Sequence, residues 1–242
     1  MTDEVRVLLE IGTKGRRVVA AATDWPGLDR WGADEASALA KLTTYLPRYA
    51  RVAELAGLAE TFARQHTIDV IERYRGSSST DFWGIAHVPS ETERAVLPAA
   101  DLERRLALLQ GCWTYFDDVV ARVSEELRPS GRGGGRSRDQ IVRHTYVSEP
   151  DQMSRKIEVR TPRDLVLTPD GLAAHRAAYL DALRAYNAEG KPARTWSIQF
   201  LIRRTAQHAM DHAWELEDRD LKGSGEDGSV IGAPGGTRTH DL

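Results

Sequence analysis

The sequence predicts an α+β protein, in which a small N-terminal β-β-α-β unit is followed by an antiparallel four-helix bundle. Apolar and polar residues alternate near the N-terminus, whereas apolar residues recur every three or four positions over most of residues 99–221, and the change comes after Pro89. The 242 residues suffice for one large domain or two small ones. We expect a small α/β unit over residues 1–90, the bundle over 91–221 and a disordered tail over 222–242.

The N-terminal unit is expected to begin with a β-hairpin. Apolar residues alternate over residues 5–11 and form a run over 18–22, and Thr13-Lys14-Gly15 supplies a turn between them. Residues 34–58 then show helical spacing of apolar side chains. Pro47 lies inside this segment and predicts a kink or a restart of the helix.

Two further strands are predicted after this helix. Residues 67–74 alternate in polarity, and the polar stretch 76–80 separates them from a short apolar segment at residues 82–85. We interpret 82–85 as a short strand that completes the unit.

Four helices are predicted in the remainder of the chain. They are expected over residues 99–127, from about Ser137 toward Val159 with a kink at Pro150, from Thr168 to Gly190, and from about Arg194 to Leu221. A Gly-rich loop at 129–135 separates the first two, and Thr168-Pro169-Asp170 is a typical helix start. Short connections favour antiparallel packing of neighbouring helices.

Composition excludes several classes of protein. The net charge of -3 gives no basic excess for nucleic acid, and no run of 18 apolar residues predicts a membrane span. The acidic start lacks the apolar segment of a secretory signal, so the expected location is the cytoplasm. Cys112 is the single cysteine. A metal site would therefore be built from imidazoles and carboxylates.

One pair of histidines has the spacing of metal ligands. His208 and His212 are four residues apart, so they project from one face of the fourth helix and can share an ion. A third ligand must come from another helix, and His144 in the second helix is the candidate. The alternative is an ordinary solvated face, because the two histidines belong to a polar stripe that includes Arg204, Glu215 and Arg219.

Residues 99–221 resemble the DinB/YfiT-like metal-binding four-helix family. The matching segments are Arg138-Asp139-Gln140-Ile141-Val142-Arg143-His144 and Gln207-His208-Ala209-Met210-Asp211-His212. The resemblance implies a divalent-metal site of zinc, nickel or iron with His144, His208 and His212 as ligands. Pro150 departs from the uninterrupted second helix of that family.

The resemblance also implies a reaction. Family members use a low-molecular-weight thiol in S-transfer or isomerisation, so a thiol and an electrophile would be the small-molecule partners. A composition rich in Ala, Arg and Gly suggests an actinobacterial source, for which mycothiol is the expected thiol. Glu215 and Asp211 lie at or beside the histidine face, and either could orient an imidazole or accept a proton. The alternative is a non-enzymatic, metal-stabilised binding protein.

The N-terminal unit is similar to the small HicB-like antitoxin fold. The similarity rests on residues 18–28 and 32–39, which give a strand, a Pro-Gly turn and an acidic helix start. It implies an interaction or homodimerisation module; the alternative is a small sheet that packs on the bundle. An antitoxin-like DNA regulator is disfavoured by the net charge.

The remaining candidates have simpler interpretations. We expect His66, His87 and His175 to be ordinary histidines and Cys112 to be a core residue. A basic loop formed by Arg128, Arg132, Arg136 and Arg138 is expected to be solvated, with anion binding as the alternative. The tail, including His240, resembles a peptide found at the ends of unrelated bacterial proteins and is left out of functional reasoning.

Overall fold

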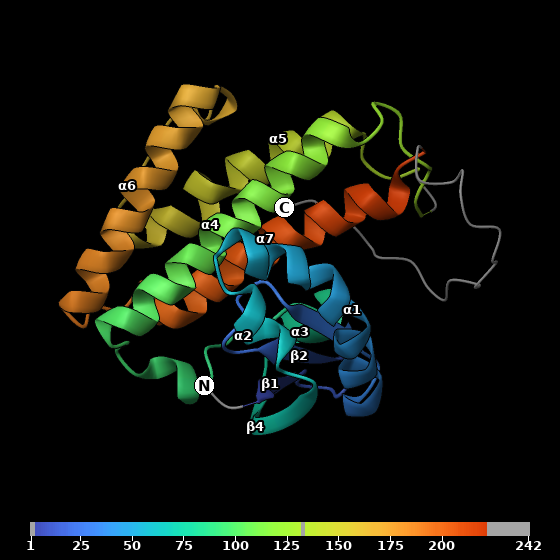
Figure 1. Cartoon of the computed structure of the whole chain (residues 1–242), viewed down its shortest axis with the longest axis vertical. Helices are drawn as coiled ribbons and strands as arrows, with labels where there is room; N and C mark the ends of the chain where they lie inside the picture. The colour runs from blue at the N-terminus through green and yellow to red at the C-terminus, as the bar shows by residue number, and fades with distance from the viewer. Residues whose placement is uncertain (1–2, 132–133, 222–242) are drawn as a thin grey trace.

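The computed structural model describes residues 3–131 and 134–221. Its N-terminal part is a four-stranded sheet with short and long helices, and its C-terminal part is helical, so the α+β class is confirmed. In Figure 1 the sheet lies at the lower end of the molecule and the long C-terminal helices lie above it. The tail predicted to be disordered lies outside the described residues.

The N-terminal part contains four strands and three helices. In chain order they are β1 (Glu4–Ile11), β2 (Val18–Ala22), β3 (Asp29–Gly32), α1 (Glu35–Leu55), α2 (Ala59–Ala63), β4 (Thr67–Arg75) and α3 (Ser78–Trp83). The strand order is β3-β2-β1-β4. Strand β1 pairs antiparallel with β2 and parallel with β4. The predicted strands at 5–11, 18–22 and 67–74 are therefore confirmed.

Two predictions in this part need correction. Residues 82–85 do not form a strand, because Ser77 caps a short helix, α3, whose last residue is Trp83 and which Gly84 terminates with a φ of 70°. A strand that the sequence pattern did not predict, β3, follows the Pro-Gly turn and pairs antiparallel with β2. Helix α1 runs through Pro47 without restarting.

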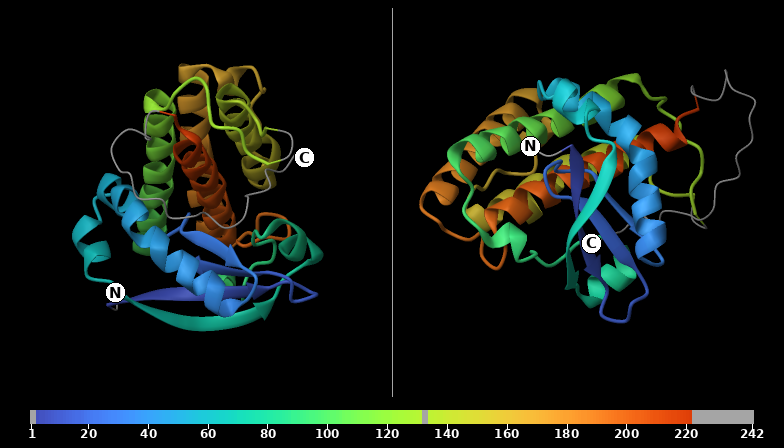
Figure 2. Two further views of the ribbon diagram at one scale, coloured as in Figure 1. Left: turned by 90° about the vertical axis from the view of Figure 1, so that its right-hand side faces the viewer. Right: turned by 60° about the horizontal axis from the view of Figure 1, so that its bottom comes forward.

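The C-terminal part is dominated by four helices. They are α4 (Ala99–Arg122), α5 (Arg138–Ser148), α6 (Pro169–Ala188) and α7 (Ile198–Arg219). The short turn η1 (Thr92–Arg94) precedes α4, and η2 (Glu149–Met153), η3 (Ser154–Ile157) and η4 (Leu165–Leu167) lie between α5 and α6. Helix α7 contacts α4, α5 and α6, and the left view of Figure 2 shows these helices standing above the sheet. Ser137, Thr168 and Ser197 cap α5, α6 and α7.

Two helix boundaries differ from the prediction. Helix α4 ends five residues before Leu127, because Ser124 turns away and donates both its backbone N–H and its hydroxyl to Asp220. Helix α7 begins at Ile198 rather than near Arg194. As Pro150 predicted, α5 does not continue regularly: a π-helical turn, η2, follows Ser148.

The hydrophobic core runs without a break from the sheet into the helices. Val7 of β1, Leu42 of α1, Leu106 of α4 and Ala206 of α7 are completely buried members of one cluster. The turn at Gly27 fits closely against the helices: its φ is 97°, and a Cβ there would lie 2.9 Å from Met210 Cγ. No helix in the described ranges is both long and apolar enough to cross a bilayer.

Candidate metal centre

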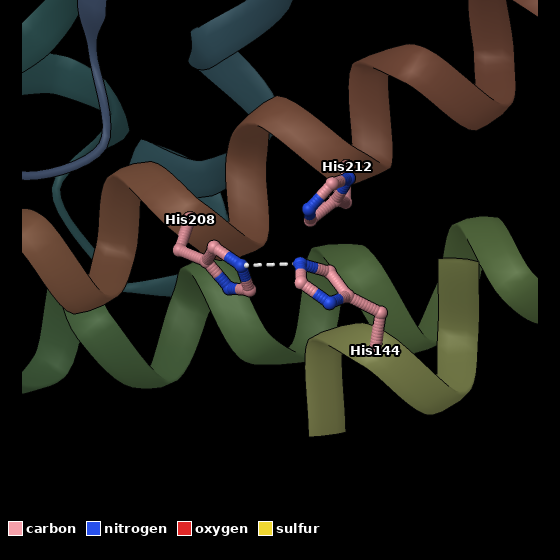
Figure 3. Close-up of side chains that lie close together, drawn as sticks. All are labelled: His144, His208 and His212. Carbon is pink, nitrogen blue, oxygen red and sulfur yellow. Dashed lines mark hydrogen bonds between the residues drawn. The ribbon is translucent and has the colours of Figure 1, made fainter. Parts of the chain in front are cut away.

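The three predicted histidines come together between helices α5 and α7. His208 and His212 lie on successive turns of α7 and point to the same side, and His144 faces them from α5 (Figure 3). The N-terminal capping box of α5, formed by Ser137 and Gln140, fixes the start of the helix that carries His144. The polar stripe of α7 is therefore not a solvated face.

The distances suit a metal ion. Nε2 of His208 lies 3.3 Å from Nε2 of His144, and the three potential ligand nitrogens all lie within 4.8 Å of one another. Metal–nitrogen bonds of about 2.0–2.1 Å place neighbouring nitrogens roughly 3 to 3.5 Å apart. The pair formed by His208 and His144 already meets this value. Three imidazoles suit zinc, nickel or iron.

The surroundings keep His208 in the form that binds metals. Burial lowers the pKa of His208 well below its ordinary value, and the neighbouring charges of His212, His144 and Arg204 act in the same direction. The imidazole of His208 is therefore neutral at pH 7. A neutral ring offers a lone pair to a metal without first losing a proton.

The structure shows which of the two candidate carboxylates, Glu215 or Asp211, contacts a histidine. Glu215 accepts a hydrogen bond from Nδ1 of His212 at 2.9 Å, and its other oxygen lies 3.2 Å from Arg219. Burial would raise the pKa of Glu215, but the hydrogen bond with His212 and nearby positive charges outweigh it, so this pKa is lowered. Asp211 instead binds Arg30 at 2.7 Å. Glu215 is thus the carboxylate in position to orient His212, because the hydrogen bond to Nδ1 leaves Nε2 of His212 free to face the other histidines.

Removing the Glu215 carboxylate should weaken metal binding. In Glu215→Ala, His212 loses the acceptor that fixes its ring, and we expect the zinc affinity to fall by about 10- to 100-fold. Competition with a chromophoric chelator measures this change. Asp211→Ala is the matched control, because it also removes a carboxylate paired with an arginine but touches no histidine. Equal losses in the two variants would contradict the role given to Glu215.

A cavity of about 160 Å³ opens beside the histidines. Both parts of the chain form its walls. The residues contributed by α7, α5 and the loop before α5 include His144, His208, Arg204, Trp214 and Arg136, and those contributed by the N-terminal part include Arg30, Trp31, Lys41, Tyr45 and Trp83. The sequence did not indicate that the N-terminal part lines this cavity, because no periodicity or motif in residues 30–83 points to a site.

Arg30 of β3 connects the two walls. Its guanidinium lies 3.9 Å from the ring centre of Trp214 and 4.0 Å from that of Tyr45, and it donates to Asp211. This arrangement between two aromatic rings and a carboxylate holds the sheet against the helix that carries the histidines.

The other candidates are placed as follows. His175 is buried on α6 beside Thr161, and Cys112 is completely buried, with its pKa raised by burial. The expectation that Cys112 is a core residue is confirmed. In the basic loop, Arg128 and Arg138 bind backbone carbonyls, whereas Arg136 lines the cavity. Arg132 lies outside the described residues.

Comparisons of the chain with protein-family models, curated proteins and solved structures give no match. The DinB/YfiT-like and HicB-like resemblances therefore stay predictions that rest on the residues quoted for them.

Proposed function

We propose that this chain is a DinB-like metal-binding protein whose helices α4, α5, α6 and α7 form the family's four-helix bundle, with η2 extending α5. The observation that carries the proposal is the convergence of His144, His208 and His212 from two helices to within 4.8 Å. Two of these residues form the His-x-x-x-His pair and the third comes from the second bundle helix, as in the pattern that the sequence resembles.

We further propose that the centre is catalytic, in a divalent-metal-dependent S-transferase or isomerase that uses a thiol of the mycothiol type. A metal that only stabilises a fold is normally enclosed by its ligands. Here a cavity of about 160 Å³ adjoins the three imidazoles, and the side chains of His144 and His208 are partly exposed in it. Room for a substrate beside three protein ligands favours catalysis over a structural role.

The residues of the chain have distinct roles in this proposal. His144, His208 and His212 would hold the metal, and Glu215 would keep Nε2 of His212 directed toward it through the hydrogen bond with Nδ1. A divalent metal bound there lowers the pKa of a coordinated thiol or water and so supplies a nucleophile at neutral pH. Cys112 takes no part, because it is completely buried in the core. The thiol is therefore brought in as a substrate.

Cobalt spectroscopy tests the proposal and separates it from the non-enzymatic alternative. Addition of mycothiol to the cobalt-loaded protein should produce a thiolate-to-cobalt charge-transfer band, because the centre has an open position. A structural centre in a metal-stabilised binding protein would keep its spectrum unchanged. His144→Ala, which lacks one of the three ligands, is the control for cobalt bound elsewhere.

A further inference from the structure

The cavity has the size and lining for one flat ring. A cavity of about 150 Å³ in another protein binds benzene, and this one measures about 160 Å³. Trp31 and Trp83 of the N-terminal part and Trp214 of α7 line it. Aromatic side chains in the lining favour a ligand with a flat apolar ring.

Arg204, a buried arginine of this cavity, forms no ion pair within 4.0 Å with a carboxylate of the described residues. Arg204 lies one turn before His208 on α7, and its side chain is more than nine-tenths buried. Its guanidinium donates a long hydrogen bond of 3.4 Å to Oε1 of Gln207, and its Nε has no hydrogen-bond partner. Burial of an unpaired charge is costly, so a side chain of this kind normally has an anionic partner.

The other buried arginines in the described ranges have such partners. Carboxylates within 4.0 Å pair with Arg30 (Asp211), Arg105 (Asp24), Arg203 (Asp29 and Glu93) and Arg219 (Glu215). Arg204 is the exception among these buried arginines, and like Arg30 it lines the cavity.

The carboxylates around the cavity do not supply the missing charge. Asp211 is paired with Arg30, Glu215 with Arg219 and Asp218 with Arg48. Lys41 and Arg136 also contribute positive charge to the lining. A ligand carrying an anionic group would therefore complete the site.

We propose that this cavity binds a small, flat organic anion, whose carboxylate pairs with Arg204 and whose ring lies against Trp31 and Trp83. This inference rests on the proposed function, for which it names the second substrate: the electrophile that meets the thiol is an anionic, planar compound. The N-terminal sheet unit thereby forms the wall that selects the substrate.

Calorimetric titration of the whole protein, zinc-loaded and metal-free, tests this inference. The probes are benzoate, its neutral analogue benzamide, and acetate, which has the charge without the ring. We expect benzoate to bind about tenfold or more tightly than either of the others, because only benzoate satisfies both Arg204 and the aromatic wall. Equal binding of benzoate and benzamide, or no binding of benzoate, overturns the inference.

Two variants assign the effect to residues. Arg204→Gln should reduce benzoate binding to the level of benzamide, and Trp31→Ala should weaken benzoate while leaving acetate unchanged. Arg204→Lys keeps the charge and guards against a folding defect in the glutamine variant; it should retain part of the preference for benzoate. An unchanged preference in Arg204→Gln overturns the inference.

Zinc content measured on the same samples distinguishes a failure of the proposed metal centre from a failure of the proposed anion site. A protein that binds no zinc but still prefers benzoate through Arg204 contradicts the proposed function and supports the anion site. A zinc-loaded protein with no preference for benzoate contradicts the anion site and leaves the proposed metal centre supported.

Discussion

Replacement of His208 by alanine is expected to abolish metal binding. His208 contributes one of three imidazoles and the closest nitrogen pair of the centre, 3.3 Å from His144. Two remaining imidazoles hold a divalent ion much more weakly than three. After dialysis against a weak chelator, wild type should retain about one zinc per chain and His208→Ala close to none, as measured by inductively coupled plasma mass spectrometry.

Thermal stability provides a second measurement of the same effect. Zinc at about 1,000 times its dissociation constant stabilises a folded protein by about 4 kcal/mol, and the variant should not show this gain. His175→Ala is the control, because His175 is a buried histidine whose Nδ1 contacts Thr161 rather than another histidine. The double variant His144→Ala/His208→Ala should behave as His208→Ala does. If wild type and the double variant retain equal, negligible zinc, the metal centre and the proposed reaction are both wrong.

Replacement of Arg203 by methionine is expected to cause the largest loss of stability. Arg203 is completely buried and bridges Asp29 of β3, at 2.6 Å, and Glu93 of η1, also at 2.6 Å. Methionine fills similar space but leaves two buried carboxylates without a cation. Breaking a buried pair in this way costs about 3–5 kcal/mol, which denaturant unfolding at pH 7 would measure.

The loss should depend on pH in a definite direction. Burial already raises the pKa of Asp29 to about 6, against the opposing charge of Arg203. Without Arg203 this pKa rises further, so the native state holds protons that the unfolded state has released. Stability of the variant therefore falls as pH rises from about 4 through the raised pKa. Arg184→Met, which breaks an exposed pair with Glu103, is the control and should cost less than about 1 kcal/mol. A loss of that size in Arg203→Met would contradict the bridging role.

Local signals in the sequence were sufficient for much of the fold. Alternation over residues 5–11 and 67–74 predicted two strands, and the capping residues Ser137 and Thr168 marked helix starts that the structure places one residue later. These features depend on neighbours within a few residues. The segment 82–85 failed because four apolar or small residues fit a strand or the end of a short helix equally well.

The three histidines of the candidate site could be predicted from the sequence, but the contribution of the N-terminal part could not. His208 and His212 share a face of α7 by spacing, and His144 was a candidate because it lies in the second predicted helix, where the resemblance also implies a ligand. Arg30 could not be found, because it reaches Asp211 across a separation of 181 residues through the docking of β3 on α7. Strand β3 itself depends on its pairing with β2, so neither the strand nor the contact leaves a local pattern.

The parallel pairing of β1 with β4 also has a consequence for how the chain is made. Strand β1 is an inner strand of the sheet and pairs with β2 on one side and with β4 on the other. During synthesis the hairpin partner β2 emerges at once, but β4 follows only after α1 and α2. One edge of a strongly apolar strand thus stays open on the ribosome while those helices are made, and an open edge is a template for pairing with another chain. The nascent protein is most exposed to misassembly in this interval, before any residue of its metal centre has been translated.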